Sequence, residues 1–324
     1  MMHETEYAYA VARVRANELT LLSATDVEQL ISAEDYKQVM RRLADTGWGD
    51  SENVTDYSHY LEQYKAKTWE LLVEIMEDIH ELDMLIIRND MQNLKAALKS
   101  AVSHNDPENL YISPTVYDTE AMIKAVEQRM FETLPECMSD VAVKAYDILT
   151  RTGNGQLADI ILDTRTLDLI YSFGKKSRNE LLSILAEYIC ATTNIKTAFR
   201  CAHTGKNREF IEDSICECDT LNKQDLIVAT LEGPDALMDF LSKTNYSEAV
   251  EMFHISTSAF EKWCDDLIMN CIKPARYKAF GVDPIVAYYL AKDAEIKSVR
   301  IILSAKLNHL PADIIRERVR ALYV

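Results

Sequence analysis

The sequence repeats one short pattern three times at equal spacing. Asn93-Leu94-Lys95 recurs as Asn194-Ile195-Lys196 and as Glu295-Ile296-Lys297, so the anchor positions 93, 194 and 295 stand 101 residues apart each time. Apolar residues stand nine before, six before and four after each anchor: Met84, Leu185 and Val286; Ile87, Tyr188 and Tyr289; Ala97, Ala198 and Val299. These offsets lie on one face of a helix, and the equal spacing predicts three related helical units.

Glycine is too scarce for a fold rich in strands or loops. The 324 residues include 8 Gly and 7 Pro, whereas glycine usually makes up about 7% of a protein. Hairpins, bulges and left-handed turns all draw on glycine. Because 48% of the residues are hydrophobic, a large core is available. The sequence therefore predicts an all-α chain of long helices joined by short loops.

The chain enters its repeat partway through one unit. A partial fourth copy, Asn17-Glu18-Leu19, stands near the start, and the chain ends soon after Glu295. We expect the last helices to complete the unit that the first helices begin. The approximate boundaries are 1–50 plus 281–324 for this shared unit, 51–153 for the second and 154–280 for the third.

Local signals predict several helix boundaries. An apolar stripe with steps near 3.6 runs from Leu61 to Ile86 and predicts one helix of about 25 residues or more. Asp283 is expected to cap a helix that starts at Pro284, and Pro311 to open another with Asp313 in its first turn. Loop signals stand at Gly47-Trp48-Gly49, Asn105-Asp106-Pro107, Gly153-Asn154-Gly155 and Gly233-Pro234.

The net charge of −17 disfavours nucleic acid and anionic membranes as partners of the bulk of the protein. From Ile285 to the end, however, seven Lys and Arg face four Asp and Glu. Arg316, Arg318 and Arg320 create this basic terminus, and we expect them to serve assembly. Lys95, Lys196 and Lys297 of the repeat suggest a basic ring on a shared surface, although the favoured interpretation is that each snorkels from a helix face or pairs with a neighbouring carboxylate.

No motif predicts a cofactor, a metal or catalysis. Gly174-Lys175-Lys176-Ser177 resembles the end of a P-loop, but Leu169 stands where its first glycine belongs, so no direct nucleotide binding is expected. Cys216-x-Cys218 has only His203 nearby, short of a zinc site. The acidic pair Asp265-Asp266 is typical of a solvated helix face. Seven cysteines at irregular spacing, without a secretory leader or an 18-residue apolar run, indicate reduced thiols in a cytosolic protein.

Three stretches resemble one protein family. IVAYYLAKDAEIKSVRIILSAKLNHLPADIIRERVRALYV, which follows Val282-Asp283-Pro284, is similar to the C-terminal signature of the C subunits of prokaryotic V/A-type rotary ATPases, the counterparts of the eukaryotic V-ATPase d subunits. YAYAVARVRANELTLLSATDVEQLI from Tyr7 and IRNDMQNLKAALK around Asn93 resemble the same family. The likeness reaches both ends and the middle of the chain; residues 140–190 contribute least to it.

The resemblance implies a funnel or socket of three pseudo-symmetric helical bundles around a central axis. It implies a monomer within the complex, on the cytoplasmic face of a membrane ring of proteolipid subunits, with the shaft subunits (D and F type) inserted in its mouth. Such a subunit is a non-catalytic rotor part that transmits torque for ATP-linked H⁺ or Na⁺ transport.

Two other functional classes compete with this interpretation. A generic helical-repeat scaffold would bind partners along an open superhelix, but solenoid repeats run about 20–50 residues. A helical metalloenzyme would carry paired Glu-x-x-His motifs. The nearest match, Asp78-Ile79-His80-Glu81, has the wrong spacing.

Overall fold

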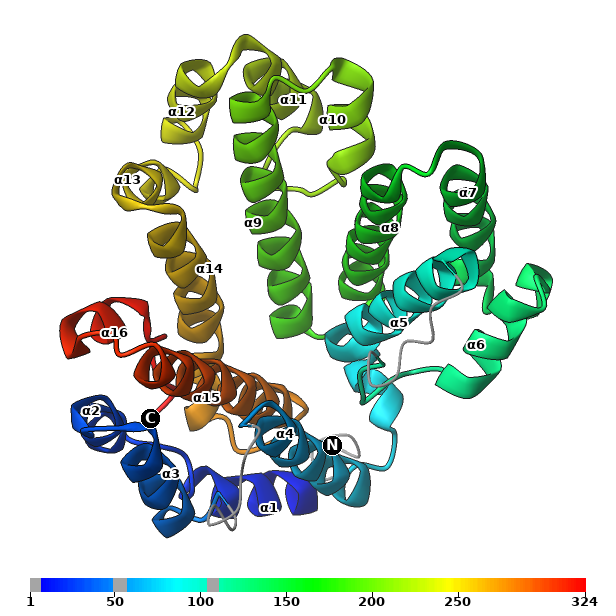
Figure 1. Ribbon diagram of the computed structural model, residues 1–324. Coiled ribbons are helices and arrows are strands. Elements are labelled where there is room, and N and C mark those ends of the chain that lie inside the picture. The colour runs from blue at the N-terminus through cyan, green and yellow to red at the C-terminus, as the bar shows by residue number, and fades with distance from the viewer. Residues whose placement is uncertain (1–6, 49–56, 104–110) are drawn as a thin grey trace. The chain divides into compact units, whose positions relative to one another are not determined.

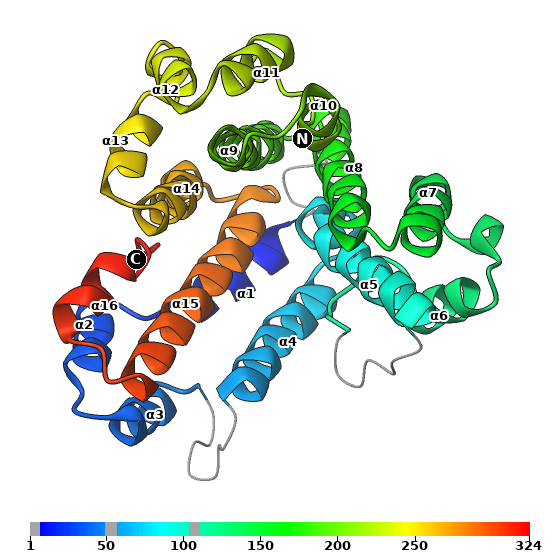
Figure 2. The ribbon, with the colours of Figure 1, turned by 45° about the horizontal axis from the view of Figure 1, so that its top comes forward.

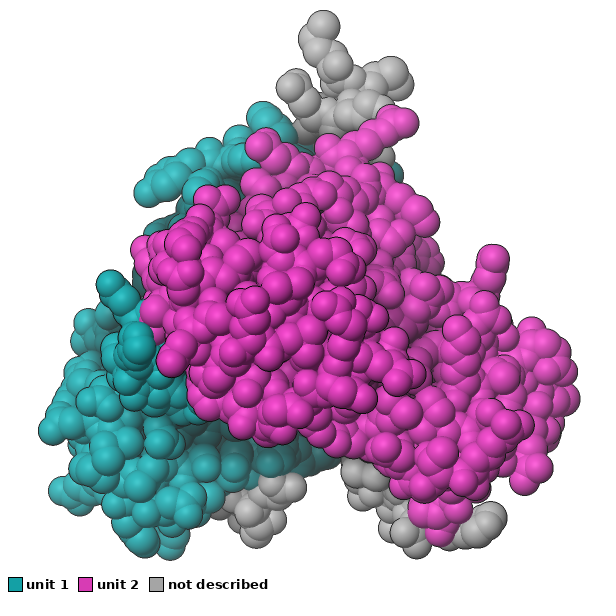
Figure 3. All heavy atoms as spheres, turned by 90° about the horizontal axis from the view of Figure 1, so that it is seen from above, with its two compact units in different colours: residues 1–79, 251–324 teal, residues 80–250 magenta. Residues whose placement is uncertain are grey.

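The computed structural model describes residues 7–48, 57–103 and 111–324. Within these ranges the chain forms sixteen α-helices and three short 3₁₀ helices, without a β-strand (Figure 1). The prediction of an all-α protein is therefore confirmed. The chain divides into two compact units: unit 1 comprises residues 1–79 and 251–324, and unit 2 comprises residues 80–250 (Figure 3).

Unit 1 joins the two ends of the sequence in one core. Its helices are α1 (Ala8–Glu18), α2 (Ala24–Ser32), α3 (Tyr36–Asp45), α4 (Tyr57–Ile75), α14 (Thr257–Ile272), η3 (Lys273–Tyr277), α15 (Asp283–Leu307) and α16 (Ala312–Arg318). Leu30, Leu43 and Leu61 from the N-terminal helices share a buried cluster with Ile302 and Leu303 of α15. Burial of this apolar surface is the main force that holds helices distant in sequence together.

Unit 2 is built around two adjacent long helices, α8 and α9. Its helices are α5 (Asp83–Ser103), α6 (Thr119–Glu127), η2 (Phe131–Thr133), α7 (Glu136–Thr152), α8 (Gly155–Lys176), α9 (Glu180–Thr204), α10 (Arg208–Ser214), α11 (Lys223–Glu232) and α12 (Pro234–Ser242). α8 packs against α5, α7 and α9. Two further helices, η1 (Ile79–Leu82) and α13 (Glu248–Ile255), contain the boundaries between the units.

The apolar stripe from Leu61 to Ile86 belongs to two helices, so the prediction of one long helix is wrong. α4 ends at Ile75 and α5 begins at Asp83, with η1 between them. Leu61 and Leu72 of α4 are buried in unit 1, whereas Ile86 of α5 is buried in unit 2. The periodicity survives because both helices bury one face, but those faces belong to different cores, and the helix breaks where the chain passes between them.

Most of the boundary signals act as expected. Gly153 ends α7 in the left-handed conformation, Asn154 caps α8, and Gly233 precedes Pro234 in the first turn of α12. Pro311 precedes α16, which has Asp313 in its first turn. The expectation that Asp283 caps α15 is wrong: Asp283 is the first residue of that helix, and its carboxylate accepts a hydrogen bond from Lys278. Gly49 and Asn105-Asp106-Pro107 lie outside the described residues.

The three copies of the repeat lie on α5, α9 and α15, the helices labelled so in Figure 2, and each anchor residue falls near the middle of its helix. Eight of the nine flanking positions are buried, and only Tyr188 is half-buried. The predicted apolar face is therefore present in each copy. The division of the chain into three units remains a prediction, since the two compact units do not test it.

Candidate interaction surfaces

Each anchor residue of the repeat is a buried hydrogen-bonding group. On α5 the Asn93 amide donates to the Ile112 carbonyl at 2.9 Å and accepts from the Ile112 amide at 2.8 Å. On α9, Asn194 binds the carbonyl and amide of Cys216 in the same way, at 2.8 and 3.1 Å. A side-chain amide supplies both a donor and an acceptor, so it satisfies both groups of an extended residue. The repeat thus preserves a structural clamp.

In the third copy the anchor residue is a glutamate, which also binds a backbone amide. Glu295 on α15 accepts a hydrogen bond from the Leu22 amide, so this clamp joins the two ends of the sequence. The carboxylate has no donor of its own, and its other oxygen receives Lys292 at 3.0 Å. Both side chains are 3% exposed. Burial raises the pKa of Glu295, and Lys292 opposes that effect. Asn17, the anchor of the partial copy, differs: its amide donates to Arg13 within α1.

The repeated lysines lie beside their anchors. Lys95 pairs with Asp163 of α8 at 2.6 Å, and Lys297 pairs with Asp265 of α14 at 3.1 Å and with Asp293 at 3.2 Å. Lys196 is half-buried at the matching place on α9. For Lys95 and Lys297 the structure therefore agrees with pairing to a neighbouring carboxylate.

Two of the three C-terminal arginines tie helices together. Arg316 of α16 binds Glu28 of α2 and Asp313, and Arg320 binds Asp265 at 2.6 Å. Asp265 thus holds both Lys297 and Arg320.

The sequence suggested that the acidic pair Asp265-Asp266 forms a solvated helix face, and this prediction is wrong. Both carboxylates bind the C-terminal segment, since Asp266 accepts a hydrogen bond from the Ala321 amide at 2.7 Å. The pair fixes the C-terminal segment to α14. Among the described residues, the Arg318 guanidinium has no carboxylate partner, and its side chain is exposed.

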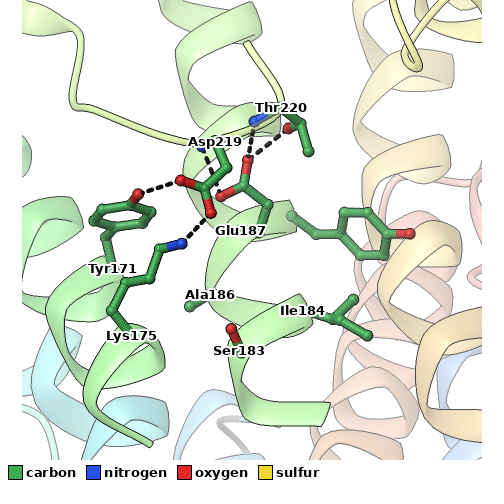
Figure 4. A pocket seen from close by; sticks show the side chains of 9 residues that line it. Tyr171, Lys175, Ser183, Ile184, Ala186, Glu187, Asp219 and Thr220 are labelled. Atoms are coloured by element: carbon green, nitrogen blue, oxygen red, sulfur yellow. Dashed lines mark hydrogen bonds and ion pairs between the residues drawn. The ribbon is translucent and has the colours of Figure 1, made fainter. Parts of the chain in front are cut away.

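Unit 2 has an open pocket of about 300 Å³ between α8, α9 and the segment that Asn194 clamps (Figure 4). Lys175 and Tyr171 of α8 converge on Asp219, and Tyr171 donates to it at 2.7 Å. Glu187 of α9 accepts from the amides of Asp219 and Thr220 at 3.0 and 2.8 Å. Each of these charged groups already has a partner within the pocket.

The pocket chemistry is that of a structural tie. Hydrogen bonds from Lys175 and Tyr171 lower the pKa of Asp219. Burial, and then the bond to Asp219, raises the pKa of Tyr171 to about 12, and Asp219 raises the pKa of Lys175. Both donors therefore keep their protons at neutral pH, and neither is an activated base or nucleophile. Gly174, which suggested a P-loop, lies inside α8 against Ala186 of α9.

The cysteines of the Cys216-x-Cys218 motif have hydrogen-bonding partners in unit 2. The Cys216 thiol lies 3.4 Å from the Asn194 side-chain oxygen, and the Cys218 thiol 3.6 Å from the Leu221 carbonyl. Burial raises the pKa of the Cys218 thiol to about 12. No group of three potential metal ligands occurs in the described part of the chain. No described helix is long and apolar enough to cross a bilayer.

Comparison with known proteins gives one consistent result. A family profile described as ATP synthase (C/AC39) subunit matches residues 10–318. The C subunit of the V-type sodium ATPase of Enterococcus hirae is 25% identical, over 98% of this chain and 99% of its own length. The C subunit of the A-type ATP synthase of Methanocaldococcus jannaschii is 23% identical, over 96% and 85%. The C subunit of the V-type ATP synthase of Thermus thermophilus is 22% identical, over 93% and 94%. This chain therefore belongs to the ATP synthase (C/AC39) subunit family.

Proposed function

We propose that the chain is a non-catalytic rotor subunit of a V/A-type ATPase or ATP synthase. It couples the soluble shaft to the membrane proteolipid ring and transmits torque between them for ATP-linked H⁺ or Na⁺ transport. The observation that carries this proposal is the family match over residues 10–318, together with relatives that are themselves named as C subunits of V-type and A-type enzymes.

The three clamps support a coupling role. A torque transmitter has to resist shear between its helices. Each of α5, α9 and α15 holds an extended segment through a buried side chain: Asn93, Asn194 or Glu295. Buried hydrogen bonds are costly to break because water does not replace them. A hydrogen bond from a backbone amide to the anchor residue recurs on α5, α9 and α15, which favours three pseudo-symmetric units around an axis, with the sequence divisions 1–50 plus 281–324, 51–153 and 154–280.

The proposed place of the protein is the cytoplasmic face of the membrane, attached through the proteolipid ring. The shaft subunits, of the D and F type, occupy the mouth of the funnel, and one copy of the chain serves each complex. An acidic chain of net charge −17 favours a basic partner surface, because complementary charge speeds correct association.

The decisive experiment is recovery of the tagged chain from membranes of its native host, with the co-purifying subunits identified by mass spectrometry. We expect catalytic-head, shaft and proteolipid-ring subunits to be recovered. If none is recovered from membranes that hold an assembled rotary ATPase, the coupling role is refuted. The alternative, a generic helical-repeat scaffold, predicts an open superhelix, which small-angle scattering of the purified chain distinguishes from a closed funnel.

The predicted interface cations are best tested at Arg318. Reversing Arg316 or Arg320 breaks ion pairs inside the protein, so a loss of assembly would have two causes. Arg318→Glu removes a guanidinium that has no carboxylate partner among the described residues. If this residue serves assembly, the variant keeps its melting temperature and recovers fewer partner subunits. Unchanged recovery would remove Arg318 from the interface.

A further inference from the structure

The segment between α14 and α15, residues 273–280, differs in character from the rest of the chain. It reads Lys-Pro-Ala-Arg-Tyr-Lys-Ala-Phe, and no Asp or Glu occurs from Lys273 to Val282. The whole chain carries 52 Asp and Glu against 35 Lys and Arg. The segments that lead into the two other helices of the repeat have no Phe, Tyr or Trp: residues 76–82 before α5 are rich in acidic residues, and Ser177-Arg178-Asn179 precede α9.

Large apolar side chains of this segment point into solvent. Tyr277 is 89% exposed and Phe280 is 52% exposed. Leu19, the residue that ends α1, is 87% exposed. It lies one helical turn beyond Arg15, whose guanidinium donates to the carbonyls of Ala275 and Lys278 at 2.7 Å. We call residues 273–280 together with Leu19 the aromatic tip.

The backbone of the aromatic tip is fixed from several sides. Besides the two bonds from Arg15, Arg276 donates to the Tyr323 carbonyl at 3.1 Å and lies 5.6 Å from the centre of the Tyr323 ring. Lys278 binds the Asp283 carboxylate. The exposed rings are therefore held out by contacts to α1, α15 and the C-terminal segment. A surface ordered before it binds loses less conformational entropy on binding.

The aromatic tip also carries positive charge that the protein does not neutralise. Within the described residues, neither Lys273 nor Arg276 is paired with a carboxylate: Lys273 donates to the Asn270 side chain at 3.4 Å, and Arg276 to a carbonyl. Since the protein as a whole is strongly acidic, two unpaired cations beside exposed rings select an occupant with negative charge around an apolar surface.

We propose that the aromatic tip docks on a partner protein of the rotary complex by placing Tyr277 and Phe280 in an apolar depression rimmed by carboxylates. The inference rests on the proposed function, because it takes the partner to be another subunit of the same complex. Tyrosine and arginine are among the side chains most enriched at the residues that dominate protein interfaces. Because the backbone holds Tyr277 and Phe280 in fixed positions, the two rings can fit a protein surface of defined shape without a further loss of conformational entropy.

A lipid surface fits the same features less well. Stable attachment to a bilayer takes two strong signals, such as two acyl chains or one chain with a polybasic patch. The aromatic tip offers two rings and two unpaired cations, and the net charge of −17 opposes approach to anionic lipid. A fluid bilayer also gains nothing from the order that Arg15 and Arg276 impose on the backbone.

The test uses the full chain, tagged and expressed in its native host in place of the wild-type copy. The main variant is Tyr277→Ser with Phe280→Ser. Its matched control is Val73→Ser with Ile255→Ser, which removes two apolar side chains of unit 1 that are 51% and 70% exposed. A second variant, Lys273→Glu, reverses a charge whose hydrogen bond to Asn270 is long, at 3.4 Å. Thermal unfolding by circular dichroism checks that each variant folds.

We expect the aromatic variant to recover partner subunits roughly tenfold less than wild type, because loss of a central aromatic anchor usually has at least this effect. Lys273→Glu lowers recovery in the same direction, and the control pair recovers them as wild type does. If wild type recovers the partners and a folded aromatic variant recovers them equally, the aromatic tip is refuted and the proposed function stands. If the aromatic variant does not fold, normal recovery by Lys273→Glu refutes the charge complementarity on which the proposal depends.

A vesicle-binding experiment distinguishes a protein partner from a lipid partner of the aromatic tip. Purified wild type and the aromatic variant are sedimented with vesicles of phosphatidylglycerol and phosphatidylethanolamine. The proposal expects no binding of either protein. Binding by wild type that the variant loses, with normal recovery of subunits, would assign the aromatic tip to lipid and overturn the proposal. Failure of wild type itself to recover any rotary subunit would refute the proposed function and this inference with it.

Discussion

Asn194→Ala tests whether the repeat encodes a structural clamp. The side chain is 1% exposed, and its two polar atoms bind the carbonyl and amide of Cys216 at 2.8 and 3.1 Å. Cys216 is itself 1% exposed, so water does not reach the groups that the substitution leaves behind. An unsatisfied buried backbone group costs about 1–3 kcal/mol. Two such groups give an expected loss of about 3 kcal/mol in the free energy of unfolding.

The corresponding substitution at Asn93 allows the free-energy costs of two clamps in the same protein to be compared. Asn93 makes the same two bonds, but its partner Ile112 is only half-buried, so water can take the place of the amide. We therefore expect Asn93→Ala to cost less than Asn194→Ala, about 1–2 kcal/mol. A matched control is Thr192→Val on α9. The Thr192 hydroxyl donates to the Tyr188 carbonyl one turn earlier on the same helix, and it bonds to no other segment of the described chain.

The measurement is urea unfolding followed by circular dichroism, combined with hydrogen exchange at the amide of residue 216. Loss of the clamp lowers the unfolding free energy and speeds exchange at the Cys216 amide, which lies between α10 and α11, before exchange within α9 is affected. The reasoning fails if Asn194→Ala costs under about 1 kcal/mol, the loss of a single net hydrogen bond. It also fails if exchange at residue 216 is unchanged, because the amide would then be protected by something other than Asn194.

Three further predictions concern stability. Gly281 has φ +86°, so Gly281→Val costs about 2 kcal/mol, and an unchanged melting temperature would contradict this. A side chain at Gly174 would overlap the Ala186 Cβ, so Gly174→Val costs about 3 kcal/mol in urea unfolding, whereas Gly155→Ala, in open space, is nearly neutral. Burial raises the pKa of Asp90 to about 6, so the unfolded state binds fewer protons than the folded one between about pH 4 and 6. Stability relative to Asp90→Asn therefore falls by up to about 3 kcal/mol as pH rises through that range; a constant difference from pH 4 to 7 would refute it.

The candidate interface could be predicted only in part. The sequence identified Lys95, Lys297, Arg316 and Arg320 as notable cations but not their carboxylate partners, which lie up to 288 residues away. Sequence distance does not reveal ion pairs between helices. The aromatic tip was missed for another reason. Residues 273–280 contain three cations and two aromatic residues and no acid, and this composition is visible in the sequence. The sequence does not show that Tyr277 and Phe280 are exposed, and without that exposure the composition does not indicate an interface.

The sequence alone determined the class of secondary structure and the repeat. Scarce glycine, a 3.6-residue apolar period and the spacing of positions 93, 194 and 295 are local properties, and they required long helices with buried faces. Only the tertiary structure decided that the stripe from Leu61 to Ile86 is two helices, because adjoining segments of one amphipathic pattern bury their faces in different cores. It also decided what the anchors do. Whether Asn194 or Glu295 binds a backbone amide depends on which segment folds against it, and for Glu295 that segment comes from the opposite end of the chain.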